Sequence, residues 1–207
     1  MKINAIRISR PSQQKFGGFE KYTAIVKQPV EGPIKVTPEG LEGNDVGNPK
    51  YHGGRHKAIY AYGAQHYTWW RATYPELEFP EGIFGENLVV EGLDEQQVSV
   101  GDQFRIGDVI LRATTPRIAC QTLAAVIGDP AFGKKFAHGG RPGIYFEVMI
   151  PGEIAPGMAM ERIKNGAAGL TQAEAFALYM GQSQDADQRS KAAQEPTLPE
   201  DWREKIG

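Results

Sequence analysis

The 207-residue sequence contains a single cysteine, Cys120, so no internal disulfide can form. It also lacks an apolar run of the roughly 18 residues that a membrane-spanning helix needs. Residues 1–6 do not begin the long apolar core of a secretion signal. We therefore expect a soluble protein of the reducing cytoplasm that does not cross a membrane.

The chain has no large excess of charge of either sign. Its formal net charge is −2, so nothing draws the whole molecule towards nucleic acid or anionic lipid, and we expect no nucleic-acid partner. Charged residues make up 23% and hydrophobic residues 41%, a composition too apolar for a disordered chain. This length is enough for one substantial core and a small appendage.

Glycine and proline are frequent, with 25 and 14 residues, and they separate many short alternating segments. This arrangement predicts a mainly β protein. A helix is expected over 64–74, where Tyr67, Trp70 and Arg71 keep helical spacing. Gly107-Asp108 suits a two-residue primed hairpin turn. Strands are expected at 3–8, 22–26, 34–36, 56–62, 88–90, 104–106, 109–111, 143–150 and 158–163.

The barrel-like pattern ends near Asn165, which divides the chain into a β domain over 1–165 and a small helical domain over 166–207. Thr171 and Glu174 have the spacing of a capping box, so we expect a helix that continues to about Met180. The polar stretch 181–196 is expected to be a linker or a solvated helix. The simplest role of this tail is to cover an open end of the main sheet.

Cys120 follows Arg117 and precedes a predicted helix start. A nearby cation and free helix N–H groups both favour the thiolate, the form of cysteine that attacks substrates or binds metals. Two other interpretations stay open: Cys120 is a small buried hydrophobe, or it is a nucleophile whose base is His138.

The loop 40–57 is rich in glycine and in cationic side chains. Glycines let backbone N–H groups approach an anion, and the cations add donors for a phosphate or another compact oxyanion. His52 and His56 lie four residues apart, but Gly53 and Gly54 oppose the helix that a zinc site of this spacing requires. Another polar segment, Glu86-Asn87, precedes a predicted strand. Its purely structural interpretation is an ordinary turn. The cationic side chains of the loop are Lys50, His52, Arg55, His56 and Lys57.

Four segments occur in a recognisable order: His52–Tyr62, Phe84–Leu88, Gly101–Asp102 and Pro116–Cys120. In this order they resemble the MOSC family, the molybdenum cofactor sulfurase C-terminal domains. The chain looks most like the stand-alone bacterial type associated with resistance to N-hydroxylated purines such as 6-N-hydroxylaminopurine. That similarity extends to the tail segments Leu170–Glu174 and Trp202–Glu204.

The resemblance implies a MOSC-type β-barrel with a few short helices and a C-terminal helical appendage. It also implies a bound molybdenum cofactor, a pterin that carries the metal, with Cys120 as the protein ligand to molybdenum. The chain departs from the family pattern at Asn44, where an aspartate is expected, and at His56, where an acidic residue is frequent. The cofactor contacts implied in this way are His52, Gly53, Gly54, Arg55, Lys57, Asn87 and Arg117.

The activity implied by the resemblance is the reduction of N-hydroxylated compounds, such as hydroxylaminopurines, amidoximes and hydroxylamines, to the amine or amidine. Cys120 and His52 are the expected catalytic residues, with His52 or His56 as a proton donor. No flavin, haem or iron–sulfur motif occurs in the sequence, so electrons are expected from a partner flavin reductase. A non-catalytic cofactor carrier and a cysteine-dependent sulfur transferase are the alternatives. We expect a monomer or a homodimer.

Overall fold

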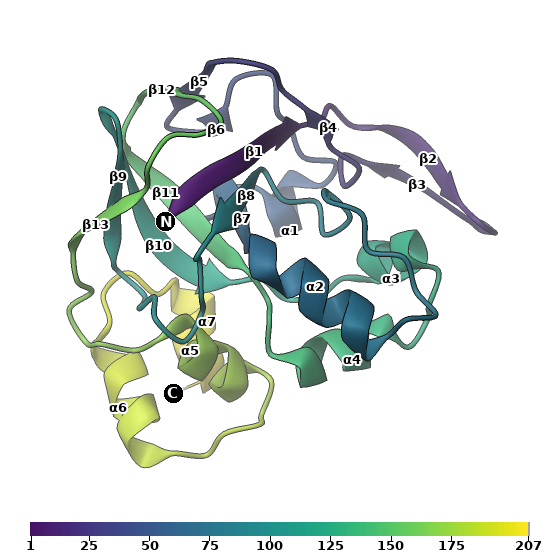
Figure 1. The fold of residues 1–207 in the computed structure, drawn as a ribbon. Coiled ribbons are helices and arrows are strands. Elements are labelled where there is room, and N and C mark those ends of the chain that lie inside the picture. The colour runs from purple at the N-terminus through teal and green to yellow at the C-terminus, as the bar shows by residue number, and fades with distance from the viewer. Residues whose placement is uncertain (207) are drawn as a thin grey trace.

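The computed structural model describes residues 1–206. Its centre is a curled mixed sheet of eight strands in the order β13-β9-β10-β11-β7-β8-β1-β4 (Figure 1). Neighbouring strands are antiparallel except for β7 and β8, which are parallel. This half-barrel matches the mainly β fold expected from the sequence. The strands are β1 (Lys2–Ile8), β4 (Gln28–Pro29), β7 (Ile59–Gly63), β8 (Leu88–Glu91), β9 (Gln103–Ile106), β10 (Val109–Pro116), β11 (Ile144–Ile150) and β13 (Glu161–Lys164).

Two smaller sheets complete the β structure. Strands β5 (Ile34–Thr37), β6 (Gly40–Leu41) and β12 (Gly152–Ile154) form one of them. The other is a hairpin of β2 (Ser12–Phe16) and β3 (Phe19–Thr23), which projects from the body of the molecule (Figure 1).

Strand β7 separates two hydrophobic cores. Ile59 and Ala61 belong to the core inside the half-barrel, whereas Tyr60 and Tyr62 belong to an aromatic core on the other face. Successive side chains of a strand point to opposite faces, so a strand covered on both sides is apolar at every position. All five residues of β7 are accordingly buried.

Helices cover the aromatic core and occupy the C-terminal end of the chain. Trp70 is fully buried there and packs against Phe132 and Phe136. None of the helices in residues 1–206 is long and apolar enough to cross a membrane. The helices are α1 (Pro49–His52), the 3₁₀ helix η1 (Arg55–Lys57), α2 (Ala64–Thr73), α3 (Gln121–Ile127), α4 (Phe132–Gly139), α5 (Gln172–Tyr179), α6 (Ala186–Gln194) and α7 (Glu200–Ile206).

The three C-terminal helices, at the lower left of Figure 1, pack around a small third core to which Val100 also belongs. The predicted capping box is present, because Glu174 N donates to Thr171 Oγ1 and Thr171 N donates to Glu174 Oε2. Trp202 and Ile206 of α7 are buried, and α6 buries only Ala192. The stretch after residue 181 therefore contains a largely solvated helix. The division into domains at residue 165 stays a prediction.

Three predicted strands have different limits in the structure. The segment 22–26 leaves the sheet after Thr23, because Ile25 N donates to Thr23 Oγ1 in a local turn. Residues 56 and 57 belong to η1, since Gly54 adopts a φ of 97° and accepts a hydrogen bond from Lys57 N. The last predicted strand, 158–163, is regular only from Glu161 onwards, because Met160 N bonds to Met1 O instead.

Candidate functional site

Cys120 is the N-cap residue of α3, at the predicted helix start. Its side chain is partly buried against the aromatic core. Burial alone would raise the pKa of the thiol, but the charge of Arg117 and hydrogen bonds from Leu123 and Thr122 lower the pKa overall. The local structure therefore favours a thiolate, the form in which cysteine binds a metal.

Arg117 is a buried cation next to this thiol. It is only 6% exposed, and its guanidinium lies over the ring of Tyr60, 4.9 Å from the centroid. The Tyr60 hydroxyl donates to Pro142 O at 2.7 Å. Burial raises the pKa of both Tyr60 and Tyr145, so both rings stay neutral at pH 7. Within residues 1–206, Arg117 forms no ion pair with a carboxylate.

His52, the last residue of α1, faces the same cations. Burial lowers the pKa of its imidazole to about 4, with further lowering by the charges of Arg117, Lys57 and Lys21. Lys57 is held in place by a hydrogen bond of 2.9 Å from its Nζ to Tyr51 O. His52 is therefore neutral at pH 7 and exposed to a positive potential.

Lys27, which the sequence analysis did not select, is a further member of the site. It is 7% exposed, and its Nζ donates to Asn44 Oδ1 at 2.8 Å and to Ala24 O at 3.3 Å. Burial and the charge of Arg117 lower the pKa of Lys27 to about 8. An ammonium has three donors, so one is left for a ligand. We call the three cations Lys27, Lys57 and Arg117, together with the neutral imidazole of His52, the cation cluster.

The acidic residues near Lys27 do not neutralise this cluster. Glu86 and Asp45 each raise the pKa of Lys27, but no ion pair with either is present among the described residues. Burial raises the pKa of Glu86 itself, whose carboxylate accepts from Tyr67 Oη and from Gly82 N. Apart from the Cys120 thiolate beside Arg117, the cation cluster therefore has no matched anion among residues 1–206.

Asn87, a predicted cofactor contact, has both ends of its amide occupied by the backbone. Its Oδ1 accepts from Tyr60 N at 3.1 Å, and its Nδ2 donates to Arg7 O at 3.1 Å. The side chain thereby links β7 to β1 and positions the strand that carries Tyr60. Each end of the amide can form one further hydrogen bond, so a contact of Asn87 with a cofactor stays a prediction.

The remaining predicted residues lie at the exposed rim. Gly54, Arg55 and His56 are exposed. The backbone N–H of Gly53 donates a hydrogen bond to Pro49 O at 3.0 Å. The break in helical structure between α1 and η1 agrees with the argument against a zinc site at His52 and His56. His138 is exposed in the last turn of α4 and is not among the groups that shift the pKa of Cys120.

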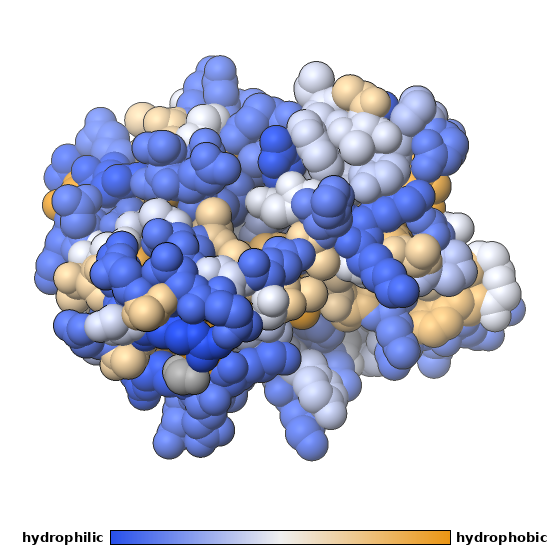
Figure 2. Space-filling view, turned by 90° about the horizontal axis from the view of Figure 1, so that it is seen from below, coloured by the Kyte–Doolittle hydropathy of each residue, from blue (hydrophilic) through white to orange (hydrophobic). Residues whose placement is uncertain are grey.

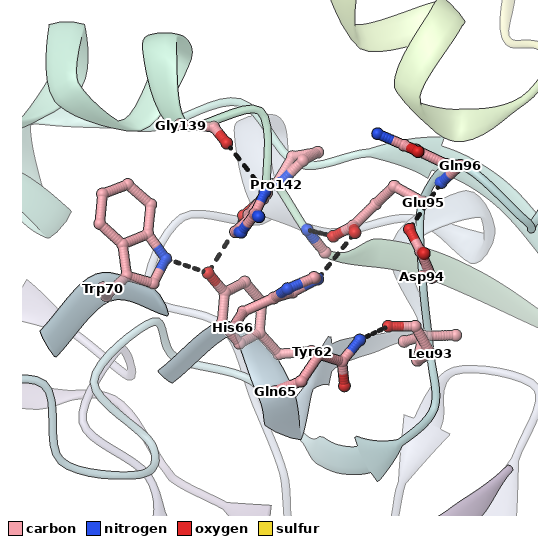
Figure 3. A network of polar contacts seen from close by, with 12 residues as sticks. Tyr62, Gln65, His66, Trp70, Leu93, Asp94, Glu95, Gln96, Gly139 and Pro142 are labelled. Atoms are coloured by element: carbon pink, nitrogen blue, oxygen red, sulfur yellow. Dashed lines mark hydrogen bonds and ion pairs between the residues drawn. The ribbon is translucent and has the colours of Figure 1, made fainter. Parts of the chain in front are cut away.

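A second buried polar cluster is centred on His66 and Glu95 and fixes the loop that precedes β11 (Figure 3). His66 Nε2 lies 2.7 Å from Glu95 Oε2, and Glu95 Oε1 accepts from Gly143 N at 2.6 Å. Gly143 O in turn accepts from Arg117 N at 3.4 Å. Gly143 adopts a φ of 71°, and a Cβ there would lie 2.7 Å from Tyr60. We call these residues the His66–Glu95 cluster.

The site fits the kind of cofactor that the resemblance implies. Among the described residues no group of three or more His, Cys, Asp or Glu side chains could hold a metal ion. A metal bound to Cys120 would therefore take its other ligands from a cofactor. Buried cations without anionic partners suit the phosphate of such a cofactor.

The chain is similar to known proteins both in sequence and in structure. The chain is 30% identical to the protein YiiM of Escherichia coli over 184 residues, which cover 88% of this chain and 82% of that protein. The crystal structure of YiiM from Geobacillus stearothermophilus aligns with a TM-score of 0.81 at 29% identity, covering 99% of this chain and 96% of that one.

A third relative is longer. A protein named "Reductase" from Gibberella moniliformis is 32% identical over 155 residues, which are 73% of this chain but 27% of that protein. The family model described as the MOSC domain matches residues 48–161, more than half of the sequence. This range contains His52, Arg117 and Cys120, so the chain belongs to the MOSC domain family.

Proposed function

We propose that this protein is a molybdenum-cofactor-dependent reductase of N-hydroxylated compounds, with electrons supplied by a partner flavin reductase. The observation that carries the proposal is the cation cluster beside Cys120, whose charges form no ion pair with a carboxylate among residues 1–206. Membership of the MOSC family and the relative named "Reductase" support an oxidoreductase.

The residues divide into a metal ligand and a set of anion contacts. Cys120 binds molybdenum as a thiolate, favoured by Arg117 and by the N–H groups of α3. Lys27 and Arg117 hold the anionic part of the cofactor from the buried side. The contacts proposed at the exposed side are His52, Gly53, Gly54, Arg55 and Lys57. Asn87 acts by positioning Tyr60 under Arg117.

The reaction breaks an N–O bond. It consumes two electrons and two protons, and it releases the amine and one water. When bound, the cofactor supplies a metal that accepts oxygen and passes on electrons. His52 is neutral at pH 7 without an anion beside it, and an anion would raise its pKa towards the range in which it holds a proton.

The test is to make the protein in a host that synthesises the cofactor and to compare it with Cys120→Ser. We expect the native protein to contain molybdenum and to reduce 6-N-hydroxylaminopurine with a reduced viologen dye. Cys120→Ser should lose at least about tenfold in both measurements, because a serine hydroxyl is a poor substitute for a thiolate ligand. Near-identical thermal unfolding of the two proteins is the control for folding.

Two results would contradict the proposal. Unchanged molybdenum content in Cys120→Ser would remove the assignment of the ligand. A native protein that is loaded with the cofactor but reduces no N-hydroxylated compound would be a cofactor carrier.

A further inference from the structure

A cavity of about 490 Å³ lies between the tip of the β2–β3 hairpin and α3. This volume is in the range of small-molecule sites. Phe16 and Phe19, which face each other in the hairpin register, line one side, and Ala124 and Ala125 of α3 line the other. Figure 1 shows the hairpin extending over the α3 side of the molecule.

The residues that line the cavity favour a neutral, flat ligand. None of its lining residues carries a charge, and Gln121 is the only polar side chain among them. Added Cβ atoms at Gly18 and Gly128 would meet nothing within 4 Å, so the backbone leaves open space beside the aromatic rings. Seen from below in Figure 2, hydrophobic surface gathers towards the right, the side of the hairpin and α3.

The residues that line the cavity include the one that follows Cys120, the metal ligand of the proposed function, but not Cys120 itself. Gln121 directly follows Cys120 and is the first residue of α3. An α-helix rises about 1.5 Å per residue, so Ala124 lies about 6 Å along the helix from Cys120. A purine ring spans a similar length. The separation along α3 is therefore of the size needed for a ring in the cavity and a reacting substituent near Cys120.

We propose that this cavity binds the aromatic ring of the N-hydroxylated substrate, which makes heteroaromatic N-hydroxylamines better substrates than hydroxylamine itself. Phe16 and Phe19 stack on the ring, and the Gln121 amide hydrogen-bonds to its edge. The inference rests on the proposed function and adds to it the residues that select the substrate.

The first experiment compares substrates with and without a ring. For 6-N-hydroxylaminopurine we expect Phe19→Ala to raise KM about tenfold, the loss expected for removing one stacked aromatic side chain. For hydroxylamine, which has no ring, the kinetic constants should not change. Tyr22→Ala is the matched control, because Tyr22 lies on the same hairpin, is 53% exposed and does not line the cavity. Ala125→Leu, which fills the cavity, should act like Phe19→Ala.

A second readout does not depend on turnover. Adenine, the amine product, should show broadened NMR signals in the presence of cofactor-free native protein and of Tyr22→Ala, and sharp signals with Phe19→Ala or Ala125→Leu. Equal broadening with all four proteins, together with unchanged KM ratios, would overturn the ring site and leave the proposed function standing. If the loaded native protein reduced neither substrate but the broadening pattern held, the reductase function would fail and the cavity would still be a purine site.

Discussion

The cation cluster and the His66–Glu95 cluster are both buried polar groups beside neighbouring tyrosines of β7. Arg117 packs on Tyr60, and His66 packs on the edge of Tyr62. In the second cluster the protein supplies each main partner, since Glu95 accepts from Gly143 N and bonds to His66. In the cation cluster, Lys27 and Arg117 are both buried. Burial and the charge of Arg117 together lower the pKa of Lys27.

This difference between the two clusters distinguishes buried polar groups that stabilise the fold from buried polar groups that bind a ligand. A buried charge is costly unless it is paired, so buried cations without an ion pair are candidates for binding an anionic ligand. The His66–Glu95 cluster should therefore stabilise the fold, whereas the cation cluster should destabilise the cofactor-free protein.

The largest effect on stability is expected at Glu95. Glu95→Ala would leave His66 and Gly143 N buried without an acceptor, at a cost of about 3 kcal/mol in the free energy of unfolding. Urea unfolding of the cofactor-free protein measures this change. The control is Glu161→Ala, whose ion pair with Arg105 is exposed, so its loss should cost less than about 1 kcal/mol. Similar costs for the two variants would contradict a structural role of the His66–Glu95 cluster.

The opposite sign is expected at Lys27. Lys27→Met removes a buried cation and keeps the length of the side chain, so the cofactor-free protein should gain about 1 kcal/mol of stability at pH 7. The lost bonds to Asn44 and Ala24 limit the gain. Urea unfolding again gives the value, and a loss above about 1 kcal/mol would show that Lys27 is a structural residue.

The gain from Lys27→Met should depend on pH. The folded pKa of Lys27, about 8, is below the unfolded value of roughly 10.4, so between these values the unfolded chain binds more protons. The contribution of native Lys27 to stability therefore rises with pH from about 8 to about 10. The advantage of the methionine variant should shrink over that interval. A constant difference from pH 7 to pH 10 would contradict the lowered pKa.

The smallest effect is electrostatic. Arg117→Gln removes a positive charge near His52 and should raise the pKa of its imidazole from about 4 by one unit or less. NMR titration of the ring of His52 in cofactor-free protein measures the shift, with His138→Gln used to assign one of the other histidine signals. An unchanged or lowered pKa would show that Arg117 does not act on His52.

Local features of the fold could be predicted from the sequence. The helix after Cys120, the capping box of Thr171 and Glu174, and the turn at Gly107 each depend on residues within a few positions of one another. Gly107 adopts a φ of 58°, as the primed turn requires. Such signals are complete within a short segment and do not depend on the rest of the chain.

The composition of the site could be predicted only in part. Arg117 lies three residues before Cys120, and His52 lies in another of the segments that carry the family resemblance, but Lys27 lies in none of them and comes near Arg117 only through the tertiary fold. Its neighbours Ile25 and Val26 suggested a strand, which the structure ends at Thr23. The local sign that Lys27 is buried is its position directly after two apolar residues. The occupation of the Asn87 amide by Tyr60 and Arg7 likewise depends on strand pairing that no local pattern encodes.

The most direct test of the account is the amount of cofactor that the Lys27→Met protein retains. Native protein, Lys27→Met and Glu161→Ala would be purified from the same cofactor-producing host, and molybdenum and pterin would be measured per chain. If the cation cluster binds the cofactor anion, Lys27→Met should be at least as stable as the native protein yet contain about a tenth of its cofactor or less, while Glu161→Ala contains the native amount. Equal molybdenum and pterin in all three proteins would contradict the account.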